Sequence, residues 1–154
     1  MLLAIDIGNS NIVIGGIQDD KIVFEARIAT DRIKTSDQYG VEIKNILSLF
    51  EVPVETVEDV IISSVVPPVF NAVRTGAYKV TGLTPMVVGP GIKTGMNVRV
   101  DDPKSLGADI LADCAGAYYE YGGPVLVADF GTATTFTHVS DKGVVCLLYT
   151  SPSP

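Results

Sequence analysis

The sequence is poor in basic residues, cysteine and histidine. Its 11 lysines and arginines stand against 18 acidic residues, which gives 154 residues a net charge of -7. Because phosphate backbones and anionic lipid surfaces attract basic proteins, we expect neither nucleic acid nor a membrane as partner. No apolar run reaches the roughly 18 residues of a membrane span, and no basic flank marks a signal peptide. These features predict a cytoplasmic protein.

The cysteines and the histidine carry no recognisable metal motif. Cys114 and Cys146 share no short spacing and lie among apolar residues, as buried or incidental thiols do in a reducing compartment. His138 has no cysteine or carboxylate cluster around it in the sequence. We interpret it as a surface or strand residue.

One pattern occurs twice in the chain. Residues 2–16 form an apolar run that ends at Asp6, turns through Gly8 and polar residues, and resumes as a second apolar run. Residues 125–136 repeat this order with Asp129 and Gly131. Each copy predicts a β-hairpin with small and polar residues at its tip. We expect the two hairpins to face each other across a nucleotide site.

The hairpin tip has the composition of a phosphate loop. Glycine lets the backbone approach a phosphate closely, and a carboxylate at the strand end can hold Mg²⁺ through water. An ordinary turn of the Gly-Asn type would explain one copy alone. Two copies favour a duplicated phosphate clamp.

The remaining pattern predicts an α/β fold with a mixed sheet. After a third strand at 22–28, we expect a helix at 37–50, with its cap in Thr35-Ser36-Asp37, and a second helix from Pro67 to Gly82. Strands are expected at 57–66 and 85–88. A third helix should follow an Asp102 cap and end at Gly122. The first helix should pack on the sheet through the face that carries Tyr39, Ile43, Ile46, Leu47 and Phe50. The second helix covers Val69, Phe70, Val73 and Tyr78, and the third has Leu106, Ile110, Cys114 and Ala117 on one face.

The repeat also predicts two domains. Residues 1–123 would form the first, and residues 124–145 the start of a second, incomplete one. Residues 146–154 continue no strand or helix pattern, and we interpret them as a non-native tail.

Two further segments are candidates for chemistry. Asp109, which follows Gly107 and Ala108, could accept the proton of a substrate hydroxyl during phosphoryl transfer; the alternative is an exposed acid on a helix, with Asp113 one turn later. Ser63 and Ser64 could cap a helix or line a cleft at a strand end. The sequence leaves both choices open.

Together these motifs resemble the type III pantothenate kinase family. The resemblance rests on Asp6-Ile7-Gly8-Asn9-Ser10-Asn11, Ser63-Ser64-Val65-Val66-Pro67, Gly107-Ala108-Asp109 and Asp129-Phe130-Gly131-Thr132-Ala133-Thr134-Thr135. That family belongs to the acetate and sugar kinase, heat-shock protein and actin superfamily. The resemblance implies two ribonuclease-H-like domains of the actin-like ATPase type. It also implies ATP-dependent phosphorylation of pantothenate, the first step of coenzyme A biosynthesis.

The resemblance also implies roles for the matching residues. ATP would be bound by Asp6, Ile7, Gly8, Asn9, Ser10, Asn11, Ile12, Val13 and Thr132, and pantothenate by Gly107, Ala108, Asp109 and Ile110. Asp109 would be the proton acceptor. Asp6 would hold Mg²⁺ through water, and Asp129 would bind a monovalent cation, K⁺ or NH₄⁺. Members of the family are cytoplasmic homodimers.

The sequence departs from the family at three places. Ile110, Val100 and Thr137 stand where the family usually has Arg, Tyr and an acid. One alternative is therefore a non-catalytic, nucleotide-binding regulatory relative, and another is a superfamily kinase acting on acetate or a sugar. The presence of both Asp6 and Asp109 favours the pantothenate kinase. Because the second domain is incomplete, we expect no kinase activity from the 154-residue chain alone.

Overall fold

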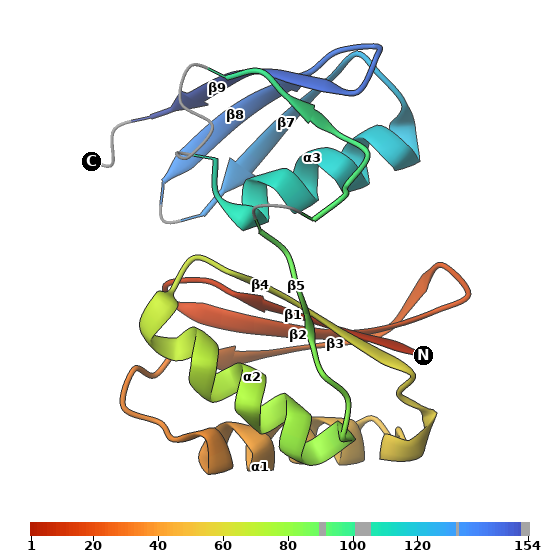
Figure 1. Cartoon of the computed structure of the whole chain (residues 1–154), viewed down its shortest axis with the longest axis vertical. Coiled ribbons are helices and arrows are strands. Elements are labelled where there is room, and N and C mark those ends of the chain that lie inside the picture. The colour runs from red at the N-terminus through yellow and green to blue at the C-terminus, as the bar shows by residue number, and fades with distance from the viewer. Residues whose placement is uncertain (90–91, 101–105, 132, 152–154) are drawn as a thin grey trace. The chain divides into compact units, whose positions relative to one another are not determined.

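The computed structural model describes residues 1–89, 92–100, 106–131 and 133–151. Contacts along the chain divide it into two compact units, Met1–Val88 and Gly89–Pro154 (Figure 1). Each unit has its own sheet and its own apolar core. In the described part of the chain, no helix has the length and apolar character to cross a membrane.

The first unit is built on a five-stranded mixed sheet of order β3-β2-β1-β4-β5. β1 pairs antiparallel with β2 and parallel with β4, so the central strand joins the hairpin to the parallel part of the sheet. The predicted α/β fold with a mixed sheet is confirmed. The strands are β1 (Leu2–Ile7), β2 (Asn11–Gln18), β3 (Lys21–Ala29), β4 (Asp59–Ser64) and β5 (Met86–Val87).

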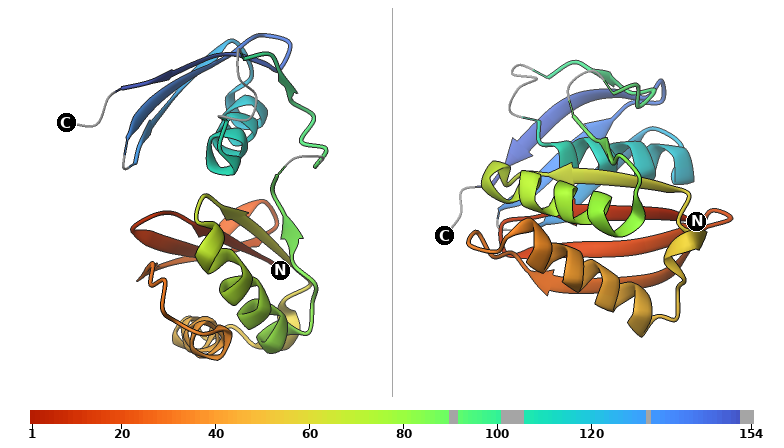
Figure 2. Two further views of the ribbon diagram at one scale, coloured as in Figure 1. Left: turned by 60° about the vertical axis from the view of Figure 1, so that its left-hand side comes forward. Right: turned by 60° about the horizontal axis from the view of Figure 1, so that its bottom comes forward.

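Two helices cover one face of this sheet, α1 (Ser36–Leu49) and α2 (Pro67–Thr81) (Figures 1 and 2). Thr35 caps α1 in a capping box with Gln38, as the Ser/Thr-x-x-Gln pattern predicts. α2 begins at Pro67 and ends at Gly82, whose left-handed φ of 72° suits glycine. A short 3₁₀ helix, η1 (Val54–Thr56), precedes β4.

The core of the first unit lies between the helices and the sheet. Its fully buried members include Leu3, Ile5, Ile7, Ile12, Ile14, Tyr39, Ile43, Leu47, Val60, Ile62, Val69 and Val73. One position of the first helix that was predicted to pack on the sheet is wrong. Phe50 is the residue that ends α1, where it stacks on Phe24 with ring centroids 4.9 Å apart and stays 39% exposed. Tyr78 lies on the outer side of α2 and is 52% exposed.

Glycines set the close approach of α1 and α2. A Cβ on Gly76 would lie 2.7 Å from the Ser36 carbonyl oxygen and 2.8 Å from the Gly40 nitrogen. Real Cβ atoms do not approach other atoms so closely, since such overlap forces backbone shifts. The glycine pair therefore fixes how near the two helices can pack.

The second unit contains a four-stranded sheet of order β6-β9-β8-β7 and one helix. The helix packs through Cys114 against Val139 and Val145, which form the centre of a small core. The elements are β6 (Asn97–Val98), α3 (Ala108–Tyr121), β7 (Val125–Phe130), β8 (Thr134–Val139) and β9 (Val144–Thr150). The second predicted hairpin, β7 with β8, is confirmed.

The predicted start of the third helix is wrong. α3 begins at Ala108, and its N-cap is Gly107 in extended conformation (φ −63°, ψ 156°). Because Gly107 is extended, the helix cannot reach back to a cap at Asp102, a residue that lies outside the described part of the chain. Leu106 therefore precedes the helix rather than joining its apolar face, although it still packs on the second core.

Residues 144–150 form a strand that the sequence pattern did not predict. β9 pairs antiparallel with β8, with Tyr149 opposite Phe136 and Leu147 opposite His138. The interpretation that no strand continues beyond residue 146 is wrong. The assignment of 146–154 to a non-native tail and the domain boundary at 123/124 both stay predictions. The two compact units meet at Val88 and Gly89, and within the second unit α3 packs with β7 and β8.

Candidate functional site

The turn between β1 and β2 is closed by its own backbone. The Gly8 N–H donates to the Asn11 carbonyl at 3.0 Å, and a Cβ on Gly8 would lie only 3.1 Å from that oxygen. A side chain at this position would therefore press on the Asn11 carbonyl, a crowding that glycine avoids. Asn9, Ser10 and Asn11 are exposed at the tip, where their amides and hydroxyl can donate to an anion.

Thr30 fastens this turn from the end of β3. Its hydroxyl donates to the Gly8 carbonyl at 2.7 Å, and its backbone N–H donates to the Ser10 carbonyl at 3.0 Å. Two bonds from one residue thus hold both sides of the turn. The sequence analysis missed Thr30, because it lies 22 residues from Gly8 and belongs to no motif.

The flanking residues of the predicted ATP loop differ in what they can offer. Ile7 and Ile12 are opposite each other in the hairpin and are both 0% exposed. Their side chains belong to the core, so only their backbone groups could contact a nucleotide. Asp6 and its partner Val13 point to the other face of the sheet, where Asp6 is exposed.

The end of β4 lies beside the end of β1. In the parallel pairing, Ser63 is the partner of Asp6 and Ser64 the partner of Ile7. The Ser64 hydroxyl accepts from the Val66 N–H at 3.1 Å and supports the turn into α2. The N-cap of α2 is Val66, which has no side-chain cap bond, so neither serine caps the helix. Ser63 is buried, and its hydroxyl has no hydrogen-bond partner among the described residues.

These residues fit a hydrated magnesium ion better than a protein-only metal cage. Among the residues described, no group of three or more His, Cys, Asp or Glu side chains could hold a metal. Mg²⁺ commonly keeps several waters and is held by one or two carboxylates plus substrate phosphates. One exposed carboxylate beside a phosphate-type turn, as at Asp6 and Gly8, suits that mode of binding.

The corresponding turn of the second unit places a carboxylate against a glycine. Asp129 is half-buried near the end of β7, paired with the buried Thr135. Its Oδ2 lies 3.4 Å from the point where a Cβ on Gly131 would be. The carboxylate therefore folds over the turn and could contribute an oxygen to a cation there. Thr132, the predicted ATP contact, lies outside the described residues.

Asp109 lies in the first turn of α3. Its Oδ1 accepts from the Ile110 N–H at 2.7 Å, one of the helix N–H groups that have no partner within the helix. Asp109, Ala108 and Gly107 are all half-buried, so this turn is accessible to a ligand.

The three positions that depart from the family pattern, Val100, Ile110 and Thr137, all lie near the Cys114 thiol or the small core that contains it. Val100 and Ile110 pack against the cluster that contains Cys114, and Thr137 is 1% exposed. Burial raises the pKa of the Cys114 thiol to about 11, with a contribution from Asp113, although a hydrogen bond with Thr137 acts in the opposite direction. The side chain of Ile110 thus serves the core, and a binding role for this residue would depend on its backbone.

His138 has a cysteine neighbour that the sequence did not indicate. Its Nδ1 lies 2.9 Å from the Cys146 Sγ across β8 and β9. Cys146 is exposed, whereas Cys114 is buried. The contact depends on pairing between strands and leaves no trace in residue spacing.

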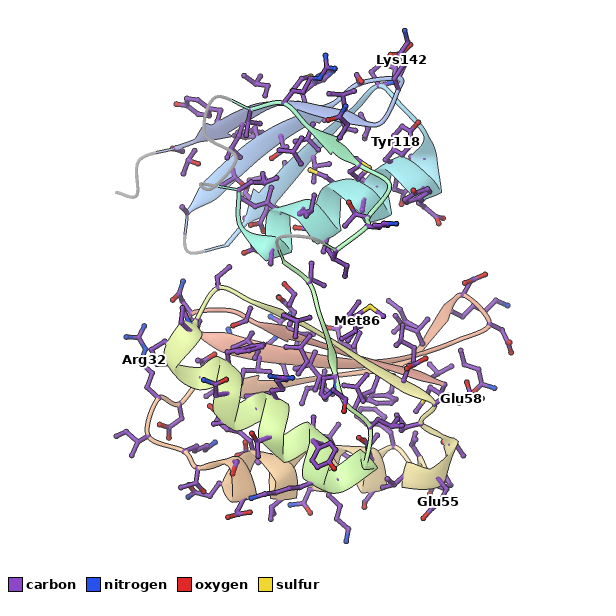
Figure 3. All side chains as sticks on the ribbon, viewed as in Figure 1. Arg32, Glu55, Glu58, Met86, Tyr118 and Lys142 are labelled. Atoms are coloured by element: carbon purple, nitrogen blue, oxygen red, sulfur yellow. The ribbon has the colours of Figure 1, made fainter. Side chains whose placement is uncertain are left out.

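A cavity of about 530 Å³ lies at the opposite end of β1 from Asp6. It is lined by Met1, Phe24, Phe50 and Glu51, together with Glu55 and Glu58, which are labelled in Figure 3. The Met1 ammonium forms an ion pair of 2.7 Å with Glu58 at this end. None of the predicted site residues lines this cavity.

Comparison with solved structures defines the class of fold. A Sinorhizobium meliloti protein named for 2-dehydro-3-deoxygalactonokinase matches with a TM-score of 0.53 and 14% identity, over 97% of this chain and 53% of that one. The Aquifex aeolicus Ppx/GppA phosphatase matches with a TM-score of 0.50 and 16% identity, over 98% and 51%. The fold is thus that of the actin-like ATPases, as predicted.

Sequence comparison gives the family. The family model of type III pantothenate kinase matches residues 2–146. A type III pantothenate kinase of Bifidobacterium longum (strain DJO10A) is 66% identical over 145 residues, which are 94% of this chain and 57% of the relative. One of Listeria innocua is 42% identical over 144 residues, with 94% and 56% covered. The chain belongs to the type III pantothenate kinase family and spans somewhat more than half the length of these relatives.

Proposed function

We propose that the protein containing this chain transfers the γ-phosphate of ATP to the primary hydroxyl of pantothenate, the first step of coenzyme A biosynthesis. The family membership supports this reaction. The observation that carries it is that the chain has both a tightly closed glycine turn after Asp6 and an accessible carboxylate, Asp109, in the first turn of α3. A module that only binds nucleotide would need the turn but not the carboxylate.

ATP binds at the turn between β1 and β2. Residues Asp6 through Val13 surround its phosphates, with donors from the exposed Asn9, Ser10 and Asn11 side chains. Thr132 is a further ATP contact in this proposal. The rigidity supplied by Thr30 matters here, because a turn that is already ordered loses little entropy when it binds.

Asp109 acts as the general base. Gly107, Ala108, Asp109 and Ile110 bind pantothenate, and the absence of bulky side chains at the first two positions leaves the carboxylate open to the hydroxyl. The hydroxyl oxygen attacks the γ-phosphorus, the bond to the ADP oxygen breaks, and Asp109 takes the hydroxyl proton. The bond from the Ile110 N–H fixes the orientation of the carboxylate.

Two cations complete the proposed site. Asp6 would hold Mg²⁺ through water, and the ion would offset the charge of the phosphates when bound. Asp129 would contribute an oxygen to K⁺ or NH₄⁺ at the second turn. The remaining proposals are that the complete protein is a cytoplasmic homodimer and that it has neither nucleic acid nor membrane as a partner.

The test is an ADP-release assay on a complete chain. Residues 1–146 can be joined to the C-terminal part of the 66% identical B. longum relative to restore the length of the family. With ATP, Mg²⁺ and NH₄⁺ present, we expect ADP release only when pantothenate is added. ADP release that ignores pantothenate but responds to acetate or a sugar would refute the proposal.

A further inference from the structure

Two serines, Ser63 and Ser64, stand at the end of β4, and they differ in their hydrogen bonds. Ser64 accepts a hydrogen bond from the Val66 N–H and so holds the turn into α2. The Ser63 hydroxyl is shielded from solvent, although the residue as a whole is 8% exposed, and it has no hydrogen-bond partner in the part of the chain that the structure describes. Buried hydroxyl groups are nearly always hydrogen-bonded, so an unpaired one calls for an explanation.

The position of Ser63 suggests what its partner is. Ser63 and Asp6 are paired residues on the parallel strands β4 and β1, and paired residues point to the same face of a sheet. Val60 and Ile62 of the same strand point to the opposite face, into the core under α1 and α2. The Ser63 hydroxyl is therefore on the side of the Asp6 carboxylate, at the carboxyl ends of both strands, where ligands bind in open α/β sheets.

We propose that Ser63 is a positioning residue for the divalent cation at Asp6, its hydroxyl accepting or donating a hydrogen bond with a water of the hydrated ion. This proposal rests on the proposed function, which brings Mg²⁺ and nucleotide phosphates to Asp6. A hydrated Mg²⁺ ion needs partners for its waters as well as a carboxylate. A neutral hydroxyl supplies such a partner without adding charge next to the phosphates.

The test is Mn²⁺ binding to the complete chain at saturating ADP, followed by electron paramagnetic resonance. Loss of an outer-sphere partner typically weakens metal binding 10–100-fold, so we expect Ser63→Ala to weaken Mn²⁺ binding by about 10-fold. ADP affinity without metal should stay unchanged. Ser63→Thr keeps the hydroxyl and should bind Mn²⁺ nearly as the parent chain does.

Ser64→Ala is the matched control, because it removes a hydroxyl one residue away that has a structural bond. It should lower the melting temperature and leave Mn²⁺ affinity within twofold. Ser63→Ala should show the reverse, an unchanged or higher melting temperature with weaker Mn²⁺ binding. Equal Mn²⁺ affinity in Ser63→Ala and the parent chain would overturn the proposal. Unchanged Mn²⁺ binding in an Asp6→Asn variant would overturn it as well. No pantothenate is present, so failure of the kinase reaction and failure of this inference are separate outcomes.

Discussion

The Thr30 hydroxyl donates a hydrogen bond of 2.7 Å to the Gly8 carbonyl, joining the end of β3 to the turn after β1. Thr30→Val keeps the shape of the side chain and removes this bond. We expect the free energy of unfolding to fall by about 1 kcal/mol, the usual net value of such a bond. Denaturant unfolding measures this, and Thr30→Ser, which retains the hydroxyl, should recover most of the loss.

Thr30→Val should also weaken nucleotide binding in the complete chain. A looser turn costs more entropy to order around the phosphates, so the KM for ATP should rise while the KM for pantothenate stays the same. A selective rise in the KM for pantothenate would contradict this role of Thr30.

Gly76→Ala should destabilise the first unit even though alanine favours helices. The new Cβ would overlap the Ser36 carbonyl and the Gly40 nitrogen, so α1 and α2 would have to separate. We expect a loss of about 1–3 kcal/mol, the cost of overpacking. Gly116→Ala is the matched control in α3, since its Cβ would meet no atom within 4 Å. It should gain up to about 1 kcal/mol from helix propensity, and equal effects of the two substitutions would contradict the packing argument.

The two thiols should differ sharply in reactivity. At pH 8 the native chain should react with a thiol reagent at the exposed Cys146 only, because Cys114 is buried and its pKa of about 11 keeps it protonated. Cys146→Ser should abolish rapid labelling, and denaturation should restore one reactive thiol. Rapid labelling of the native Cys146→Ser chain would show that Cys114 is accessible.

The raised pKa of Cys114 predicts that the free energy of unfolding falls as the pH rises above 9. Its thiol ionises near the ordinary value of 9.0 when unfolded but only near 11 when folded. Between these values the folded state holds more protons, so its stability falls as pH rises. Chemical unfolding at pH 8 and at pH 10.5 measures this change. Between the two pH values, the free energy of unfolding should fall less for Cys114→Ala than for the parent chain.

The outer face of the second sheet should drive self-association of the 154-residue chain. Leu126, Phe130, Leu147 and Tyr149 are between 55% and 77% exposed on β7 and β9, and Phe136 joins them at ring-centroid distances of 6.5 Å to Phe130 and to Tyr149. Exposed apolar patches of this kind favour association. Sedimentation velocity should show oligomers of the parent chain, and Leu147→Glu should lower the fraction of chain in oligomers. Tyr121→Glu, at an exposed site on α3 outside this face, should leave them unchanged.

Local sequence signals predicted the first unit well. The alternating apolar residues indicated the hairpin of β1 and β2, the cap signal in Thr35-Ser36-Asp37 indicated the start of α1, and Gly82 indicated the end of α2. These features depend on a few neighbouring residues, which is why a single sequence reveals them.

Prediction failed where the outcome depends on distant contacts. β9 contains Cys146-Leu147-Leu148-Tyr149, an unalternating run whose strand state comes from pairing with β8 across a register shift at His138/Val139. Asp102 and Pro103 carry a helix-start signal, yet the extended Gly107 starts α3. In the candidate site, Asp6 and Asp109 could be found from motifs. Ser63 was also a candidate, but its place beside Asp6 comes from the pairing of β4 with β1. Thr30 could not be found, because its two bonds to the turn after β1 join separate strands.

The most direct test of the pantothenate kinase proposal is phosphorus NMR of the reaction product. The complete chain, supplied with ATP, Mg²⁺, NH₄⁺ and pantothenate, should produce a new phosphomonoester signal on pantothenate along with ADP. Asp109→Asn should produce no such signal, since loss of a general base costs about 10²–10⁴-fold in rate. Its ATP affinity should stay within about twofold of that of the parent chain. ADP formed with phosphate released only to water, or a phosphomonoester still formed at the parent rate by Asp109→Asn, would contradict it.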